Sequence, residues 1–226
     1  MRGGGSSKRR GTSRHISGPE DFAQVFEVSR ETLDRLRLYA DLLVSWSKVQ
    51  DLVAPSTLPD VWHRHIADSA QLLALAPEAM RWADLGSGAG FPGLVLAIMA
   101  IGRPGWCMHL IESNGRKCSF LREVARRCGA PVEIHCMRIE NLATHHTVAG
   151  VQVVTARALA PLSELLGLAQ PLLLQSTVAL LPKGRDASRE IEEARRRWHF
   201  EAQLHPSLTD PDGRIVEIRQ LRPSGS

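Results

Sequence analysis

Apolar residues recur at helical spacing in the first part of the chain. Five of them follow one another at steps of three or four positions: Leu33, Leu36, Tyr39, Leu43 and Trp46. This period aligns their side chains along one face of an amphipathic helix over about residues 30–50. Ser29 directly precedes the pattern and is suited to act as its N-cap.

A second helical pattern covers about residues 59–76. The residues expected on its buried face are Trp62, Ile66, Ser69 and Leu73. Asp60, Arg64 and Asp68 stand four positions apart beside that face, so we expect them to form a ladder of ion pairs. His65 shares the apolar face and has Asp68 one turn away, and we interpret it as a hydrogen-bonded structural histidine.

The pattern changes at Trp82, where short apolar runs begin to alternate with helical stretches. The predicted strands are 82–85, 106–111, 132–137, 151–156, 177–181 and 214–219, and the predicted helices between them are 94–100, 116–128, 162–174 and 188–198. This alternation indicates an α/β fold with a doubly wound, mostly parallel sheet. We therefore expect a disordered basic tail (1–18), an N-terminal helical extension (19–77) and a Rossmann-like domain (78–226).

The segment ADLGSGAGFPG, residues 83–93, joins the first predicted strand to the following helix and contains four glycines. Glycine permits positive φ and close approach of a ligand to main-chain N–H groups, so Gly86, Gly88 and Gly90 predict a nucleotide-type site. The spacing also fits the G-x-G-x-x-G pattern of NAD- and FAD-binding folds. Asp84 argues against that alternative, because a carboxylate repels a pyrophosphate and attracts the ammonium and sulfonium groups of S-adenosylmethionine.

Residues directly after the other strands are further candidates, since ligands of such sheets bind beyond the carboxyl ends of the strands. Glu112 follows the second run at the offset where a carboxylate accepts hydrogen bonds from ribose hydroxyls. Ile139 and Glu140 follow the third run, where an adenine ring and its exocyclic amine are expected. Arg157 and Lys183 follow the next two runs; Arg157 is suited to the cofactor carboxylate, the target base or a structural ion pair, and Lys183 to an RNA phosphate or plain surface.

Composition narrows the class of protein. The 226 residues carry a net charge of +4, but the first fifteen hold five Lys or Arg and no acid, so the remainder carries 4 − 5 = −1. Binding to nucleic acid must then depend on local basic clusters or on the tail. No apolar stretch reaches the ~20 residues of a membrane span. The four cysteines show no C-x-x-C pair or zinc spacing, so we expect reduced thiols in a cytoplasmic protein, without a disulfide or bound metal. We also expect the protein to be a monomer.

Six segments together resemble the glucose-inhibited division protein B family, the small-subunit rRNA methyltransferases G of bacteria. They are RHIADS (64–69), DLGSGAGFPG (84–93), IESNGRK (111–117), RIENL (138–142), TARALAPL (155–162) and LPKG (181–184), within a match from about 31 to 219. The resemblance implies a class I S-adenosylmethionine-dependent methyltransferase that modifies N7 of a guanine in the decoding-region loop of 16S rRNA. It also implies cofactor contacts from Gly86, Phe91, Ile139, Glu140 and Arg157, with Glu112 at the ribose.

Guanine N7 is a lone-pair nucleophile that loses no proton, so its methylation needs alignment rather than a general base. We accordingly assign no catalytic residue and name Arg157 and Lys183 as positioning candidates. RNA contacts are expected from basic side chains: Arg64, Arg116, Lys117, Arg122, Arg126, Arg127 and Lys183. Two alternatives stay open, namely a non-catalytic RNA-binding protein of small-subunit assembly and a methyltransferase for another substrate.

Overall fold

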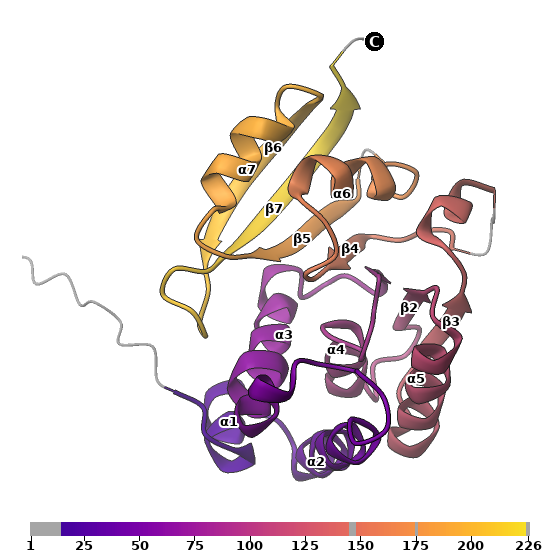
Figure 1. The fold of residues 1–226 in the computed structure, drawn as a ribbon, viewed down its shortest axis with the longest axis vertical. Helices are drawn as coiled ribbons and strands as arrows, with labels where there is room; N and C mark the ends of the chain where they lie inside the picture. Colours follow the sequence, from indigo (N-terminus) through magenta and orange to yellow (C-terminus); the bar gives the residue numbers. More distant parts are fainter. Residues whose placement is uncertain (1–14, 145–147, 175, 225–226) are drawn as a thin grey trace, which may run out of the picture.

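A computed structural model describes residues 15–144, 148–174 and 176–224, so most of the predicted basic tail lies outside the described residues. A single seven-stranded sheet runs through the molecule (Figure 1). Its strands are β1 (Arg81–Leu85), β2 (Cys107–Glu112), β3 (Val132–Cys136), β4 (Val153–Ala156), β5 (Val178–Lys183), β6 (Trp198–Pro206) and β7 (Arg214–Pro223).

The strands lie in the order β3-β2-β1-β4-β5-β7-β6. The first five are parallel, and β7 pairs antiparallel with both β5 and β6. The predicted α/β class with a mostly parallel sheet is therefore confirmed. Because the chain reverses between β1 and β4, the carboxyl ends of these central strands open toward a crevice at the switch point.

Strand β6 is absent from the sequence prediction, which continued a helix through Trp198. The helix α7 (Ala187–Ala194) ends earlier than expected. From Trp198 onward the more buried residues, Phe200 and Ala202 among them, alternate with exposed ones, which is the period of a strand with one covered face. Arg195, Arg196 and Arg197 precede Trp198 and fit a helix as well as a turn, so the sequence does not show where the helical period ends.

Two predicted features before the sheet have different outcomes. Helix α2 (Arg30–Trp46) is confirmed, and the Ser29 hydroxyl accepts a hydrogen bond from the Thr32 N–H at its N-terminus. The second helix is not one regular helix but a succession of short elements: η1 (Pro55–Asp60), η2 (Trp62–Ala67), α3 (Asp68–Ala70) and η3 (Gln71–Leu75). The π-helical turn of η2 alters the spacing of side chains, so the predicted ladder does not form. Asp60 instead pairs with His15, and Asp68 with Arg157.

Helices cover both faces of the sheet (Figure 1). One face packs against α2, α4 (Gly93–Met99) and α5 (Gly115–Cys128), and the other against α6 (Leu162–Ala169) and α7. The short helix α1 (Pro19–Phe26) completes the N-terminal part. Buried residues from before and after Pro77 share the first core, so the N-terminal helices and the sheet form one hydrophobic unit. Within the described ranges, none of the helices has the length and apolar character that crossing a membrane requires.

Candidate functional site

The glycine segment between β1 and α4 forms a tight loop whose backbone needs glycine at several positions. Gly86, Gly88 and Gly90 have φ of 66°, 56° and 96°, a region that other residues rarely adopt. At Gly90 an added Cβ would lie 2.3 Å from Leu94 Cδ1 and 2.9 Å from the Tyr39 hydroxyl. The loop is also tied to the neighbouring strand, because the Ser87 N–H donates to the Ile111 carbonyl at 3.0 Å. The loop therefore keeps one shape.

Asp84 acts differently from the sequence prediction. Its carboxylate is completely buried, accepting a hydrogen bond from the Gly93 N–H at 3.1 Å and another from the Thr155 hydroxyl at 3.1 Å. Burial raises the pKa of Asp84 to about 7. The expectation that this carboxylate faces a positively charged ligand is therefore wrong, since its oxygens hold the start of α4 and strand β4 to the loop.

The loop is held by a stack of three aromatic rings, in which Phe91 of the loop packs against Tyr39 and His65. The Tyr39 hydroxyl donates to the Ala89 carbonyl at 2.6 Å, and its ring lies 5.2 Å from that of Phe91. The His65 ring stacks on Phe91 at 4.9 Å and 22°. Phe91 is therefore largely a packing residue, 5% exposed, although its edge still lines the cavity above the loop.

Arg157 connects this stack to the helical region before β1. Its guanidinium lies 5.1 Å from the Phe91 ring centre, donates to the Arg64 carbonyl at 3.0 Å and to His65 Nδ1 at 2.9 Å, and lies 3.6 Å from the Asp68 carboxylate. Burial lowers the pKa of Arg157, yet a guanidinium keeps its proton at physiological pH. Arg157 is thus both an ion-pair partner and a wall of the site.

The environment of His65 fixes its protonation state. Because Arg157 can only donate, His65 Nδ1 must accept, and the Nε2–H then donates to the Thr57 hydroxyl at 2.8 Å. Burial, followed by the charge of Arg157, lowers the pKa of His65 to about 3. His65 is therefore a neutral, hydrogen-bonded histidine whose partners are Thr57 and Arg157 rather than the expected Asp68.

Glu112 lies beside the loop at the end of β2. One carboxylate oxygen accepts from the Gly88 N–H at 2.9 Å and the other from the Asn114 N–H at 2.7 Å. Ile139 and Glu140 begin η4 (Ile139–Thr144) just after β3, with Ile139 half-buried and Glu140 exposed. Glu112 thus contacts the glycine loop directly, whereas Ile139 and Glu140 follow the carboxyl end of the neighbouring strand β3. None of the three is among the residues that line the cavity above the loop, and their contacts with a cofactor stay a prediction.

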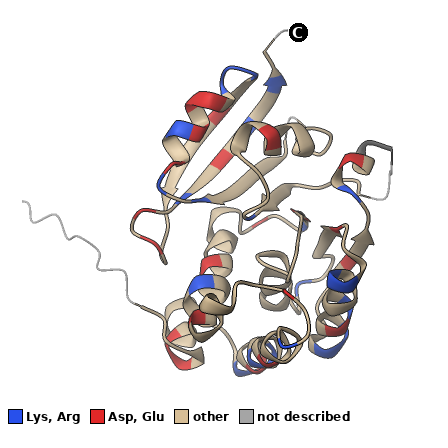
Figure 2. Cartoon of the chain, viewed as in Figure 1, with Lys and Arg blue, Asp and Glu red and all other residues tan. Residues whose placement is uncertain are grey.

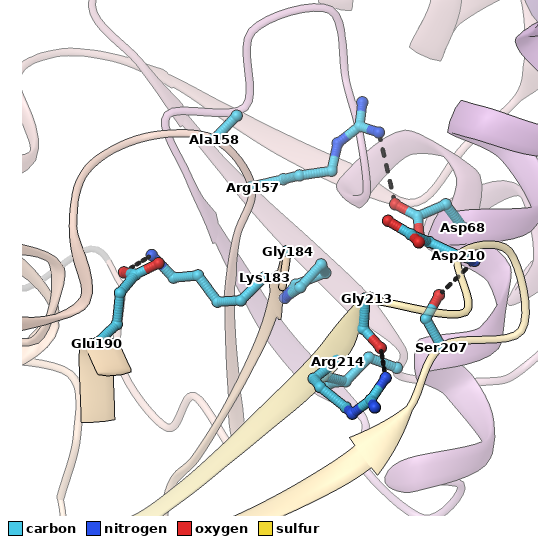
Figure 3. Close-up of a pocket in the computed structure, with 12 residues that line it drawn as sticks. Asp68, Arg157, Ala158, Lys183, Gly184, Glu190, Ser207, Asp210, Gly213 and Arg214 are labelled. Atoms are coloured by element: carbon cyan, nitrogen blue, oxygen red, sulfur yellow. Dashed lines mark hydrogen bonds and ion pairs between the residues drawn. The ribbon is translucent and has the colours of Figure 1, made fainter. Parts of the chain in front are cut away.

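Two cavities meet at Arg157 and Ala158. The loop cavity, about 390 Å³, is lined by residues that include Gly86, Gly88, Phe91 and Lys117. The charged cavity, about 350 Å³, is lined by residues that include Asp68, Lys183, Glu190, Ser207, Asp210 and Arg214 (Figure 3). Ala158 has φ of 51°, a strained value for alanine that is typical of functional sites.

Most residues of the charged cavity were missed by sequence reasoning, and Lys183 has another environment than predicted. The Lys183 ammonium donates to the Glu190 carboxylate at 2.8 Å and to the Ala160 carbonyl at 2.9 Å, and only 11% of its side chain is exposed. It is therefore not a free surface cation for an RNA phosphate. The one sequence signal was the turn DPDG at 210–213, which predicts a loop near the start of the last strand.

The other predicted RNA-binding residues lie on two elements. Arg116, Lys117, Arg122, Arg126 and Arg127 belong to α5; we call them its basic band, although uncharged residues and Glu123 lie between them along the helix (Figure 2). Lys117 also lines the loop cavity, and Arg126 pairs with Glu123 at 2.9 Å. Arg64 lies on η2 with an exposed side chain. Their contacts with RNA stay a prediction.

Comparison with known proteins agrees with this geometry. Residues 32–215 match the family model of rRNA small subunit methyltransferase G. Ribosomal RNA small subunit methyltransferase G of Methylorubrum populi is 54% identical over 86% of this chain and 91% of its own, and that of Parvibaculum lavamentivorans is 52% identical over 89% of each.

Solved structures of similar fold share little sequence. The O-methyltransferase TomG from Streptomyces achromogenes, in complex with SAM, has a TM-score of 0.57 at 15% identity and covers 88% of this chain and 94% of its own. The SAH-bound methyltransferase PaMTH1 of Podospora anserina has a TM-score of 0.55 at 15% identity, covering 85% of this chain and 96% of its own. These two likenesses concern the fold.

Proposed function

The chain belongs to the rRNA small subunit methyltransferase G family, and from that premise we propose that it transfers a methyl group from S-adenosylmethionine to N7 of a guanine in 16S rRNA. The observation that carries the proposal is the meeting of two cavities at Arg157 and Ala158. A methyl transfer needs donor and acceptor on either side of one short path, and two adjoining cavities supply that arrangement.

We assign the cofactor to the loop cavity. The Gly88 backbone is open enough for a ligand, since an added Cβ would meet only the Gly86 carbonyl, at 3.7 Å. Glu112 stays the candidate for the ribose hydroxyls, because each of its oxygens keeps one lone pair after accepting from the backbone. Lys117 and Arg157 line the same cavity and suit the carboxylate of the methionine part. When bound, S-adenosylmethionine supplies an electrophilic methyl group.

We assign the target guanine to the charged cavity. Guanine presents acceptors at O6 and N7 and donors on its Watson–Crick edge. Arg157 and Arg214 line the cavity as hydrogen-bond donors, while the exposed carboxylate of Asp210 lies there as an acceptor (Figure 3). Lys183 has an indirect role, because its ion pair with Glu190 holds one wall of the cavity in place.

No side chain of the two cavities is assigned as a general base. N7 attacks with a lone pair and releases no proton, so alignment in a cavity that excludes water supplies the rate enhancement. Asp84 and His65 serve this alignment by fixing the loop and Arg157. The basic band of α5 and Arg64 would hold the RNA backbone. We place the reaction in the cytoplasm, carried out by a monomer.

The proposal is tested with small subunits from a strain that lacks this protein. Purified protein and S-adenosylmethionine are added to naked 16S rRNA, protein-bound 16S rRNA and whole subunits, and N7-methylguanine is located by reduction and aniline cleavage. We expect one new cleavage site in the decoding region on at least one of the three substrates. Methylation of another atom, or cofactor binding in calorimetry without any turnover, would refute the proposal.

A further inference from the structure

Three side chains with metal-binding chemistry lie together on the outer strands of the sheet, and a fourth lies beside one of them. Cys107 and His109 belong to β2, and Glu133 and His135 to β3. In each pair the two residues are two positions apart, so their side chains lie on the same face of the strand. The strands are paired in parallel, with His109 opposite Glu133. The cluster lies toward the start of β2, whereas the loop cavity lies beyond its end at Glu112.

The separations in this cluster are those of a metal coordination shell. His109 Nδ1 lies 3.4 Å from a Glu133 oxygen and 3.1 Å from His135 Nε2. Cys107 Sγ lies 3.9 Å from the other Glu133 oxygen. A tetrahedral zinc ion with bonds of about 2.0–2.3 Å separates its ligand atoms by roughly 3.3–3.7 Å. These three separations therefore lie in that range or within a few tenths of an ångström of it.

We propose that Cys107, His109 and Glu133 bind a zinc ion, with His135, whose Nε2 lies 3.1 Å from His109 Nδ1, as the neighbouring candidate for the fourth position. The ligand atoms of the first three residues all lie within 4.8 Å of one another. A thiolate, imidazole nitrogens and a carboxylate form a ligand set that suits zinc among the divalent metals of cells. The inference does not rest on the proposed function.

Charge and burial support binding at this place. His109 is only 2% exposed, so its ring is shielded from bulk water. The thiolate of Cys107 and the carboxylate of Glu133 would together balance the two positive charges of the ion. Zinc binding would displace the proton of the Cys107 thiol.

The site would have a structural effect, because β3 is the edge strand of the sheet and has only β2 as a neighbour. A metal shared by the two strands would fasten this edge in addition to the backbone hydrogen bonds. The sequence prediction of no metal considered cysteine spacing alone. The signal lies instead in the pairs C-x-H (107–109) and E-x-H (133–135), which become one cluster only when the two strands pair.

The test is calorimetric titration of the metal-stripped full chain with zinc chloride. Cys107→Ser and Glu133→Gln replace partly exposed side chains and are expected to leave folding intact. Cys136→Ser is the matched control, since Cys136 is an exposed thiol that directly follows His135. We expect one zinc ion per chain for the wild type and Cys136→Ser. Affinity should fall by more than 100-fold in the two site variants, beyond the roughly 10–100-fold that outer-shell changes cost.

A second measurement identifies the ligands directly. Cobalt chloride added to the stripped protein should produce an intense thiolate-to-cobalt absorption band in the wild type and in Cys136→Ser, and none in Cys107→Ser. Zinc should raise the melting temperature of the same two proteins only. Equal zinc affinity in all four proteins, or no saturable binding of one ion in the wild type, would overturn the proposal.

Discussion

The two cavities that meet at Arg157 are lined by different parts of the chain. One wall of the loop cavity is the continuous segment 83–93, whose form is fixed by buried hydrogen bonds and stacked rings, and the other walls come from residues 52–57, His65, Lys117, Arg157 and Ala158. The charged cavity is lined by side chains from chain segments that are far apart in sequence, such as Asp68, Glu190 and Arg214. Main-chain groups of a loop can bind a ligand common to many enzymes, whereas a wall of side chains can be altered to select one acceptor.

This difference also explains the position of Arg157. Its guanidinium is fixed by the Arg64 carbonyl, His65 and Asp68, and it borders both cavities. The glycine loop and the side-chain wall thus meet at one side chain whose guanidinium is held by three partners. The four predictions that follow test this division, beginning with the largest effect.

Gly90→Ala tests whether the loop is as rigid as its contacts indicate. The new Cβ would meet Leu94 and Tyr39 and occupy a left-handed backbone conformation, so we expect the free energy of unfolding to fall by about 3 kcal/mol. Gly115→Ala is the control, because nothing lies within 4 Å of its added Cβ and the residue begins α5. Urea unfolding measures both, and similar stabilities would show a loop that adapts.

Arg157→Lys tests whether one side chain serves both cavities. A lysine cannot reproduce the planar set of donors to the Arg64 carbonyl and His65. We expect kcat/KM for small-subunit methylation to fall by about 100-fold, which corresponds to roughly 2.7 kcal/mol. Arg189→Lys, an exposed change on α7, serves as the control. A variant with normal kcat/KM would remove Arg157 from the reaction path.

His65→Gln separates two opposing pH effects within the loop support. Between about pH 6.5 and 3, the unfolded chain binds a proton that the buried His65 does not, so acidification destabilises the fold. Between about pH 7 and 3.8, Asp84 has the opposite effect, because the folded state then binds the extra proton.

In the His65→Gln variant the titration of His65 is removed, while that of Asp84 between about pH 7 and 3.8 remains. We therefore expect the variant to gain stability relative to the wild type as the pH falls from 6.5 to 4, by at most about 1.4 kcal/mol per pH unit. Urea unfolding at a series of pH values measures this difference. Parallel stability curves for the two proteins would argue against a neutral, buried His65.

Arg126→Ala combined with Arg127→Ala tests whether RNA extends from the charged cavity past the loop to α5. Affinity should fall by about tenfold, and the slope of log K against log salt should decrease in magnitude by about 1 to 2. The matched control is the exposed pair Arg196 and Arg197 beyond α7, each changed to alanine. Filter binding over a range of salt concentrations measures both slopes, and identical slopes would place the RNA elsewhere.

The sequence predicted the loop cavity far better than the charged one. Gly86, Gly88 and Gly90 lie in one short segment, so their spacing alone predicts a strand-to-helix turn suited to a ligand. The direction of the Asp84 side chain could not be read from the same segment, because its partner Thr155 comes from a strand seventy-one positions away. Position along the chain predicted where Asp84 lies, but not which way its carboxylate points.

The charged cavity depends on pairings that no local pattern contains. Ser207, Asp210 and Arg214 reach the site only because β7 inserts between β5 and β6. The sequence analysis missed β6, and with it the hairpin that carries these residues. Arg157 was found because it directly follows a strand, whereas its ion pair with Asp68 required the irregular helical region before β1.

The hydrogen bond from Tyr39 to the Ala89 carbonyl has a consequence for protein engineering. The Rossmann-like part looks like a module that could be grafted onto another recognition segment by cutting near Pro77. Such a cut would remove two of the three rings, those of Tyr39 and His65, and leave Phe91 without its stacking partners. A transplanted module would therefore need a substitute for Tyr39 before its glycine loop could take up a ligand.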